Sequence, residues 1–427
     1  MNMRTLSIAG FSLMLVGVAP VLLAVPVTQL EERGDGGFWI GPVNLSPTLD
    51  ASVFYDSNPD EVSESRKRLM EDAEDYDGDR FESAVGYNIQ PGLNVTLPGN
   101  RWSLISRLYY VYERDDSDYT RSPKDWSVST ALQGDTEGGL QWQVGQVWQQ
   151  LSYEKYDEFS QEDRQAFRLH GNLAKAVTEK SRVSLGANYS NVKYDDEFAY
   201  DTKYTTFSLG VSHQLTEKTD GIVSLAYGIN ESEDESSKAH QYNLSVGLGS
   251  RATEKLNYRA LIGVSMYEDF EYELPDGSRE DSESDYSLSY DLSVNWRPTE
   301  RISVNLTGGS SYEAAEDVRQ DSLLAYTLVC SMNYRMFQRL QLSSGVAYRH
   351  EDYLRNVKRG GEDVFTGTKE DGDPRKDDQI NVFGNVTFGL NRYASLFLNG
   401  LYSVTDSDID DFDYDRYRIS AGVALKY

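Results

Sequence analysis

Four histidines and one cysteine are the residues of this 427-residue chain that most often carry catalysis or bind transition metals. A single thiol excludes both an intramolecular disulfide and a site built from several thiolates. No Gly-x-Ser-x-Gly sequence marks a nucleophilic serine, so each histidine is predicted to be structural or solvated. We therefore expect a protein that is not an enzyme and has no cofactor or metal site. The residues are His170, His213, His240, His350 and Cys330.

Arginine is the side chain whose spacing suggests a function, because it recurs on one side of segments whose other side is apolar. In a barrel those arginines face the lumen and form a cationic zone for anionic solutes. Alternatively, several of them lie at strand ends, where they cap the rim or pair with loop carboxylates. The predicted lumen-lining charges are Arg107, Arg168, Arg182, Arg259, Arg297, Arg349, Arg418 and the acid Asp291.

Acidic residues dominate the chain, with 69 Asp and Glu against 41 Lys and Arg and a net charge of −28. This balance excludes a nucleic-acid partner, which requires a cationic surface. The acids concentrate in polar connections such as 60–79, 268–285 and 406–415. None of these has the glycine and terminal glutamate of an EF-hand loop. We interpret them as solvated loops that share divalent ions with lipopolysaccharide phosphates.

Apolar residues alternate with polar ones in the segments that carry the arginines. In 417–427 one side reads Tyr, Ile, Ala, Val, Leu, Tyr and the other reads Arg, Ser, Gly, Ala, Lys. Segments 242–251 and 286–297 show the same pattern. A period of two predicts β-strands. The alternation continues for ten residues or more with Tyr or Trp near the ends, whereas soluble strands average about five or six residues. Long strands with aromatic ends are typical of outer-membrane barrels.

Connections between these strands follow a regular order, which gives the strand count. A short turn formula recurs at Thr178–Lys180, Thr216–Lys218, Thr253–Lys255 and Thr299–Arg301, and four more tight turns follow the same spacing. Eight short turns and nine longer polar connections join eighteen strands. We therefore predict an all-β, transmembrane, antiparallel up-and-down barrel with short periplasmic turns and longer acidic extracellular loops. The longer connections lie near 57–81, 113–125, 153–163, 193–203, 230–239, 268–285, 313–321, 351–378 and 405–415.

The first residues indicate export. Residues 1–24 hold Arg4 and then an apolar run that Pro20 interrupts, which predicts a secretory signal peptide. We expect 25–42 to be a short periplasmic segment and 43–427 to form one barrel. The predicted location is the outer membrane of a Gram-negative cell, with membrane lipid and lipopolysaccharide as partners.

The opening strand Leu45-Ser46-Pro47, the segment Tyr55-Asp56-Ser57-Asn58-Pro59 and the sequence Gln90-Pro91-Gly92-Leu93 carry a resemblance. Together with the serial hairpins and the aromatic end, they resemble outer-membrane β-barrel porin families associated with extracellular or capsular polysaccharide gene clusters of Gram-negative bacteria. The resemblance implies a pore or a polysaccharide-linked barrel, and no catalytic residues.

The aromatic end of the chain predicts an assembly signal. Many barrels end in Phe, and Tyr427 is expected to serve as an aromatic equivalent read by the barrel-assembly machinery. The predicted signal comprises Tyr417, Ile419, Val423, Leu425 and Tyr427.

Three functions remain open at this point. The leading one is a passive channel for small hydrophilic solutes, with a link to polysaccharide export. The second is a non-conducting structural or adhesive barrel that presents acidic loops. A lipid-modifying enzyme is the third, and it requires a Ser–His or Asp–His pair near the outer rim, for which the sequence offers no motif.

Overall fold

The computed structural model describes the strands and their short turns in twelve stretches of the chain. The predicted signal peptide and most of the long acidic connections lie outside these described residues. The described residues are 37–58, 83–116, 124–154, 161–194, 201–232, 238–270, 272–273, 279–280, 284–313, 323–353, 375–409 and 412–427.

Eighteen long strands form the wall, as the turn count predicted. They have 12 to 16 residues each. Three short strands accompany them: β1 (Phe38–Ile40), β13 (Tyr272–Glu273) and β14 (Arg279–Glu280). The wall consists of β2 (Val43–Asp56), β3 (Ala84–Pro98), β4 (Trp102–Asp115), β5 (Lys124–Asp135), β6 (Gln141–Glu154), β7 (Gln161–Ala176), β8 (Ser181–Tyr194), β9 (Thr202–Gln214), β10 (Thr219–Ser232), β11 (Lys238–Thr253), β12 (Leu256–Phe270), β15 (Ser284–Trp296), β16 (Ile302–Glu313), β17 (Leu323–Arg335), β18 (Leu340–Tyr353), β19 (Lys376–Gly389), β20 (Ala394–Ser407) and β21 (Tyr414–Lys426).

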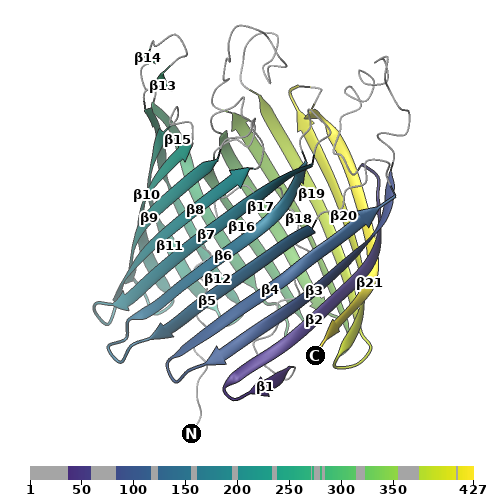
Figure 1. Ribbon diagram of the computed structural model, residues 1–427. Helices are drawn as coiled ribbons and strands as arrows, with labels where there is room; N and C mark the ends of the chain where they lie inside the picture. The colour runs from purple at the N-terminus through teal and green to yellow at the C-terminus, as the bar shows by residue number, and fades with distance from the viewer. Residues whose placement is uncertain are drawn as a thin grey trace.

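Each wall strand pairs antiparallel with its neighbours in sequence, and the last strand pairs with the first. The closing ladder joins β2 to β21 from Thr48 and Lys426 to Asp56 and Arg418. The result is a closed up-and-down barrel with its short turns and Tyr427 at one end (Figure 1). Full closure leaves no free edge among the eighteen wall strands, which is what a lipid environment demands of β-structure.

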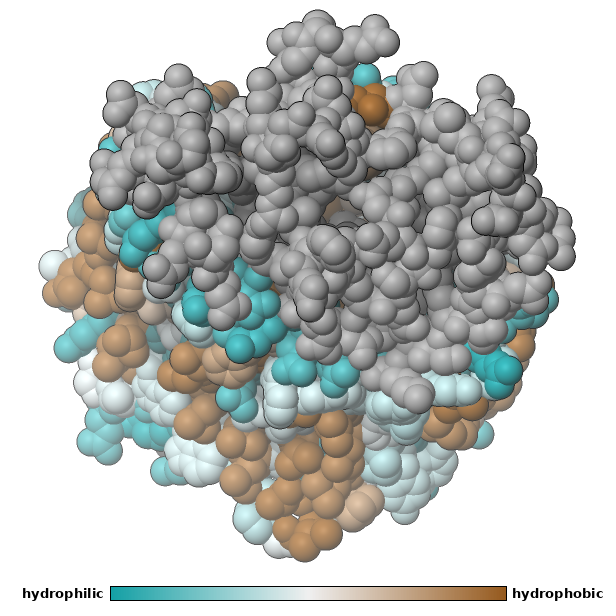
Figure 2. All heavy atoms as spheres, turned by 45° about the horizontal axis from the view of Figure 1, so that its top comes forward, coloured by the Kyte–Doolittle hydropathy of each residue, from teal (hydrophilic) through white to brown (hydrophobic). Residues whose placement is uncertain are grey.

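Side chains alternate between the two faces of the wall, as the period of two predicted. On β21, Ile419, Val423 and Leu425 are 37 to 50 % exposed on the outer face, while Arg418 points inward beside Asp56. Most large apolar side chains that remain exposed lie on outward-facing positions, and Figure 2 shows them on the outer wall. A barrel with lipid outside and water inside accounts for this arrangement, since neither face then needs a packed core.

Strand length matches a membrane. A 14-residue strand extends over about 46 Å, and a tilt of about 40° leaves roughly 35 Å along the axis. The apolar band of an outer-membrane barrel is about 25 Å tall, so the strands cross it and extend into both interfaces. Among the described residues no helix has both the length and the apolar composition needed to cross a bilayer.

The recurring threonine turns are built by side-chain hydrogen bonds. In the first of them, the backbone N–H groups of Lys180 and Ser181 donate to Thr178 Oγ1 at 3.2 and 2.9 Å. The hydroxyls of Thr216, Thr253 and Thr299 accept equivalent bonds in their own turns. A hydroxyl that caps its own turn fixes the tight connection between two strands. This is why the formula repeats along the sequence.

One stretch of wall lacks a complete ladder. Pairing between β15 and β16 stops at Asp291 and Gly309, although β15 begins at Ser284 and β16 continues to Glu313. Ser310 Oγ donates to the backbone oxygen of Leu288 at 3.3 Å and accepts from the N–H of Tyr290 at 3.2 Å. A side chain thus takes the place of the backbone in closing this seam.

Aromatic packing fills the seam toward the long connections. Tyr312 of β16 is 3 % exposed and stacks on Tyr267 of β12, with ring centroids 5.1 Å apart. Ala239 and Leu324 complete this buried apolar cluster. The two tyrosines meet because β15 and β16 no longer hold a common ladder at this level.

Candidate functional site: the charged inner wall

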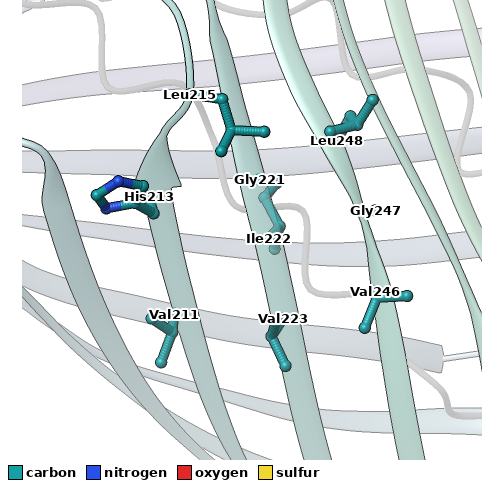
Figure 3. Close-up of a pocket in the computed structure, with 9 residues that line it drawn as sticks. All are labelled: Val211, His213, Leu215, Gly221, Ile222, Val223, Val246, Gly247 and Leu248. Atoms are coloured by element: carbon teal, nitrogen blue, oxygen red, sulfur yellow. The ribbon is translucent and has the colours of Figure 1, made fainter.

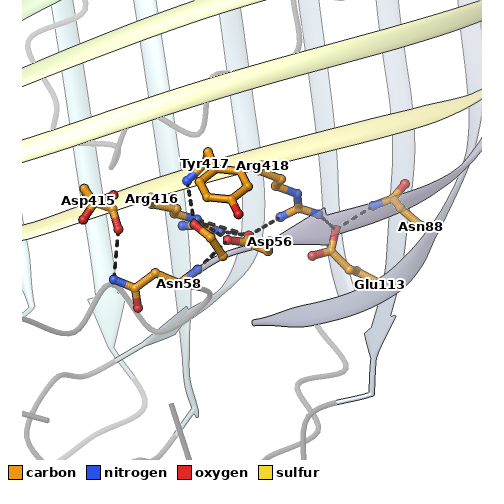
Figure 4. Close-up of polar contacts among 9 residues, drawn as sticks. Asp56, Asn58, Asn88, Glu113, Asp415, Arg416, Tyr417 and Arg418 are labelled. Atoms are coloured by element: carbon orange, nitrogen blue, oxygen red, sulfur yellow. Dashed lines mark hydrogen bonds and ion pairs between the residues drawn. The ribbon is translucent and has the colours of Figure 1, made fainter. Parts of the chain in front are cut away.

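Charged side chains on the inner face were predicted to carry the function, and the structure places them in two distinct environments. The first environment is a network at the closing seam of the barrel (Figure 4). Arg416 Nε donates to both carboxylate oxygens of Asp56, at 2.9 and 3.1 Å. Asp56 is 1 % exposed. Arg418 approaches the same carboxylate to 3.8 Å and forms an ion pair with Glu113 at 2.7 Å.

This network extends over four strands. Asn88 of β3 donates to Glu113 of β4 at 3.1 Å, so β3 and β4 join β2 and β21. The guanidinium of Arg418 lies 4.0 Å from the ring centroid of Phe54. Phe54 in turn occupies the space over Gly86, where a Cβ atom would come within 2.3 Å of the ring. The charge of Arg418 is therefore held by two carboxylates and an aromatic face.

A second network covers β16, β18 and β19. Arg349 donates to Glu313 at 2.8 Å and forms an ion pair with Glu351. Tyr353 Oη donates to Glu351 at 3.1 Å. Nearby, Arg375 Nε donates at 2.8 Å to Asp377, whose side chain is fully buried. These arginines also have their charge balanced by neighbouring carboxylates.

Two of the predicted lumen charges bind each other. Arg259 of β12 and Asp291 of β15 form an ion pair of 3.2 Å across adjacent strands. The period of two placed both residues on the inner face, but it could not identify them as partners.

The remaining predicted arginines have different surroundings. Arg107 of β4 and Arg168 of β7 make no ion pair with any described residue, and Arg168 Nε is buried without a hydrogen-bond partner there. Arg182 of β8 donates to the amide oxygen of Gln141. Arg297 follows the end of β15 in a short turn and is exposed, with its backbone N–H bonded to Lys255 O at 2.7 Å.

Sequence reasoning missed the acidic half of these networks. Asp56, Glu113, Glu313 and Glu351 all lie on inward-facing positions of their strands. The same period of two that selected the arginines also selects these acids. The pattern does not show which strands lie close together in the barrel. Glu113 and Arg418, for example, are 305 residues apart in the chain.

The predicted assembly signal lies along the outer face of the last strand. Tyr417, Ile419, Val423, Leu425 and Tyr427 are between 37 and 55 % exposed there. Tyr427 stacks on Tyr393 with ring centroids 5.6 Å apart, and its backbone oxygen accepts from Ser46 Oγ at 2.7 Å. The end of the chain is thus attached to both neighbours of the closing strand.

Histidines form three hydrogen-bonded pairs that the sequence did not reveal, and one of these joins His240 Nδ1 to Tyr227 Oη at 2.6 Å. His350 Nδ1 contacts Asp378 at 2.9 Å on the outer face near the long connections, and its Nε2 lies 3.5 Å from Asp352. His213 Nδ1 contacts Ser181 Oγ at 2.9 Å near the opposite end. Among the described residues, no serine contacts the Asp–His pair and no carboxylate orients the Ser–His pair. Neither pair assembles the nucleophile, base and orienter of hydrolytic catalysis.

An apolar hollow lies beside His213 on the outer face (Figure 3). It forms over Gly221, where the absence of a side chain leaves a depression between Val211, Leu215 and Val246. Its lining is nearly all apolar, so it suits a lipid chain better than a hydrophilic solute. The described residues contain no group of three or more His, Cys, Asp or Glu side chains that could hold a metal ion.

Comparison with known proteins supports the porin resemblance for part of the chain. The model of a family described as "Putative beta-barrel porin 2" matches residues 285–427, which run from β15 to the C-terminus. The match supports the resemblance to outer-membrane β-barrel porin families over about the last third of the chain. No curated protein matches the sequence.

Solved structures with a similar course of the chain have little sequence identity to it. They include the siderophore receptor PiuA from Acinetobacter baumannii, with 8 % identity, 92 % of this chain and 82 % of that chain covered, and a TM-score of 0.47. OpdK of Pseudomonas aeruginosa, solved with vanillate, has 11 % identity, coverage of 90 % and 99 %, and a TM-score of 0.44. OccAB4 of Acinetobacter baumannii has 11 % identity, coverage of 90 % and 98 %, and the same TM-score.

Proposed function

We propose that this porin-like outer-membrane barrel acts as a passive channel for small hydrophilic solutes. The observation that carries the proposal is the polar, charged inner face of a closed barrel of eighteen strands. Barrels of sixteen to eighteen strands commonly enclose an aqueous channel, because the diameter grows with strand number. Charged groups such as Arg107 remain exposed on the inner face, which favours a lumen that holds water.

The proposal includes a location and partners. The outer membrane of a Gram-negative cell supplies the lipid and lipopolysaccharide that the apolar outer face requires. The barrel-assembly machinery is the proposed partner for insertion. A link to polysaccharide export rests on the family resemblance, and it is tested by adding oligosaccharides of increasing length to a conducting channel and measuring which lengths interrupt the current.

Conductance of the protein refolded into a planar bilayer tests the channel function. We expect stable, ohmic single-channel steps in potassium chloride. Folding is checked separately by circular dichroism and by the change in gel mobility on heating that folded barrels show. Absence of conductance from a protein that passes both checks would contradict the channel function and favour a non-conducting structural or adhesive barrel.

A further inference from the structure

Charge balance differs between the two halves of the inner wall. From β12 through β21 to β2, the inward arginines Arg259, Arg349 and Arg416 each contact a carboxylate within 3.2 Å. On β4, β7 and β8, three inward arginines, Arg107, Arg168 and Arg182, contact no carboxylate among the described residues, whereas a fourth, Arg164, is buried and has interactions of its own. Positive charge is thus neutralised on one side of the lumen and left available on the other.

Register places two of these arginines in one row across the wall. Arg107 is opposite Ser129, Ser129 is opposite Val147, and Val147 is opposite Arg168. The row crosses three strand spacings of about 4.8 Å, which puts the two backbone positions roughly 14 Å apart. Both side chains between them are uncharged. Arg182 lies nearer the short turns, since it is the second residue of β8.

The environment of Arg168 favours an anion. Its Nε is buried and has no acceptor within the described part of the chain. A buried N–H group without an acceptor is costly, and a carboxylate or phosphate supplies two oxygens in the geometry that the planar guanidinium fork matches. The neutral side chains of Val147 and Ser190 lie opposite it on β6 and β8, so no neighbouring carboxylate on those strands competes for it.

We propose that Arg107, Arg168 and Arg182 form an anion pathway along the β4–β8 side of the lumen, which binds small carboxylate- or phosphate-bearing solutes weakly and in succession. This inference rests on the proposed channel function and names its solute class. Successive weak sites permit both entry and release. The net charge of −28 does not oppose it, because the screening length is about 8 Å at physiological salt and the carboxylates of Asp291 and Glu313 on the opposite wall are paired with arginines.

Reversal potential under a potassium chloride gradient tests the pathway. We expect the unmodified channel to pass chloride better than potassium. The double variant Arg107→Gln and Arg168→Gln should lower the chloride-to-potassium permeability ratio several-fold, and each single variant should lower it by less. Arg297→Gln is the matched control, because it removes the same charge from an exposed turn outside the wall. We expect it to leave the ratio unchanged.

Inorganic phosphate provides a second readout on the same channels. We expect added phosphate to reduce the chloride current, with a half-blocking concentration that rises about tenfold in the double variant. Arg107→Lys with Arg168→Lys retains the charge and should remain anion-selective even if the Gln variant fails to fold. A conducting channel that prefers potassium, or a Gln variant as anion-selective as the Arg297→Gln control, overturns the anion pathway and leaves the channel intact. Absence of conductance from folded protein overturns both.

Discussion

At the residue scale, Asp56 is the acid on which the closing seam depends. Its carboxylate is buried and accepts hydrogen bonds from Arg416. Removing one member of a buried ion pair leaves the other charge uncompensated, which costs about 3 kcal/mol or more. We therefore expect Asp56→Asn to lower the free energy of unfolding by roughly 3 kcal/mol. Urea titration of the protein in lipid vesicles, followed by tryptophan fluorescence, measures it.

Asp50 provides the control, because it lies on the same face of the same strand and its carboxylate has no ion-pair partner among the described residues. We expect Asp50→Asn to lower the free energy of unfolding by much less than Asp56→Asn does. Equal losses in the two variants would mean that the Asp56–Arg416 contact contributes no specific stability. A further variant, Arg416→Met combined with Asp56→Asn, should recover part of the loss because it removes the uncompensated charge.

The same residues illustrate how far the sequence predicts the site. Alternation predicts Arg418 on the inner face of the last strand, where its guanidinium contacts Asp56 and Glu113. Its partner Glu113 lies on β4, and only closure of the barrel brings these strands close together. A period of two defines a face, whereas an ion pair also requires register and the reach of a long side chain across intervening strands. The networks therefore follow from the fold and not from local pattern.

At the element scale, the strand count was predictable and the β15–β16 seam was not. Threonine turns and long strands repeat, so their number can be counted. The seam depends on how small residues at Gly308 to Ser311 allow Tyr312 to fill a gap against Tyr267. The backbone register with β17 continues unchanged through this segment. The outward apolar positions of β16 give way to Gly308 and Ser310, but this change of residue type does not show which of the two ladders ends.

Hydrogen exchange should detect that seam. The N–H groups of β15 between Ser284 and Tyr290 that point toward β16 lack its backbone acceptors. We expect these amides to exchange at least tenfold faster than the amides of β17, which pairs along its whole length on both sides. Exchange measured by mass spectrometry on the protein in vesicles gives the comparison. Protection of β15 equal to that of β17 would show that the ladder continues to the end of the strand.

At the scale of the whole molecule, closure of the barrel brings its first and last strands together. The N–H of Tyr427 donates to Pro47 O at 3.1 Å, and its ring lies between Tyr393 and Phe38, at 5.6 and 6.2 Å. The C-terminal residue therefore contacts the first and second-last strands of the wall. Until the barrel closes, this aromatic end is available to an assembly factor, which is consistent with its proposed role as a signal.

Substitutions of Tyr427 distinguish its proposed role as an assembly signal from its contacts in the closed barrel. We expect Tyr427→Ala to slow insertion by the purified assembly machinery several-fold, and Tyr427→Phe to retain the rate of the unmodified protein. The inward neighbour supplies the control, because Lys426→Ala leaves the outer aromatic residue in place. Gel mobility with and without heating measures the folded fraction over time. Unassisted folding into thin vesicles should change little in Tyr427→Ala, because its backbone bonds to β2 remain. A machinery-dependent rate unaffected by Tyr427→Ala would place the signal elsewhere in the chain.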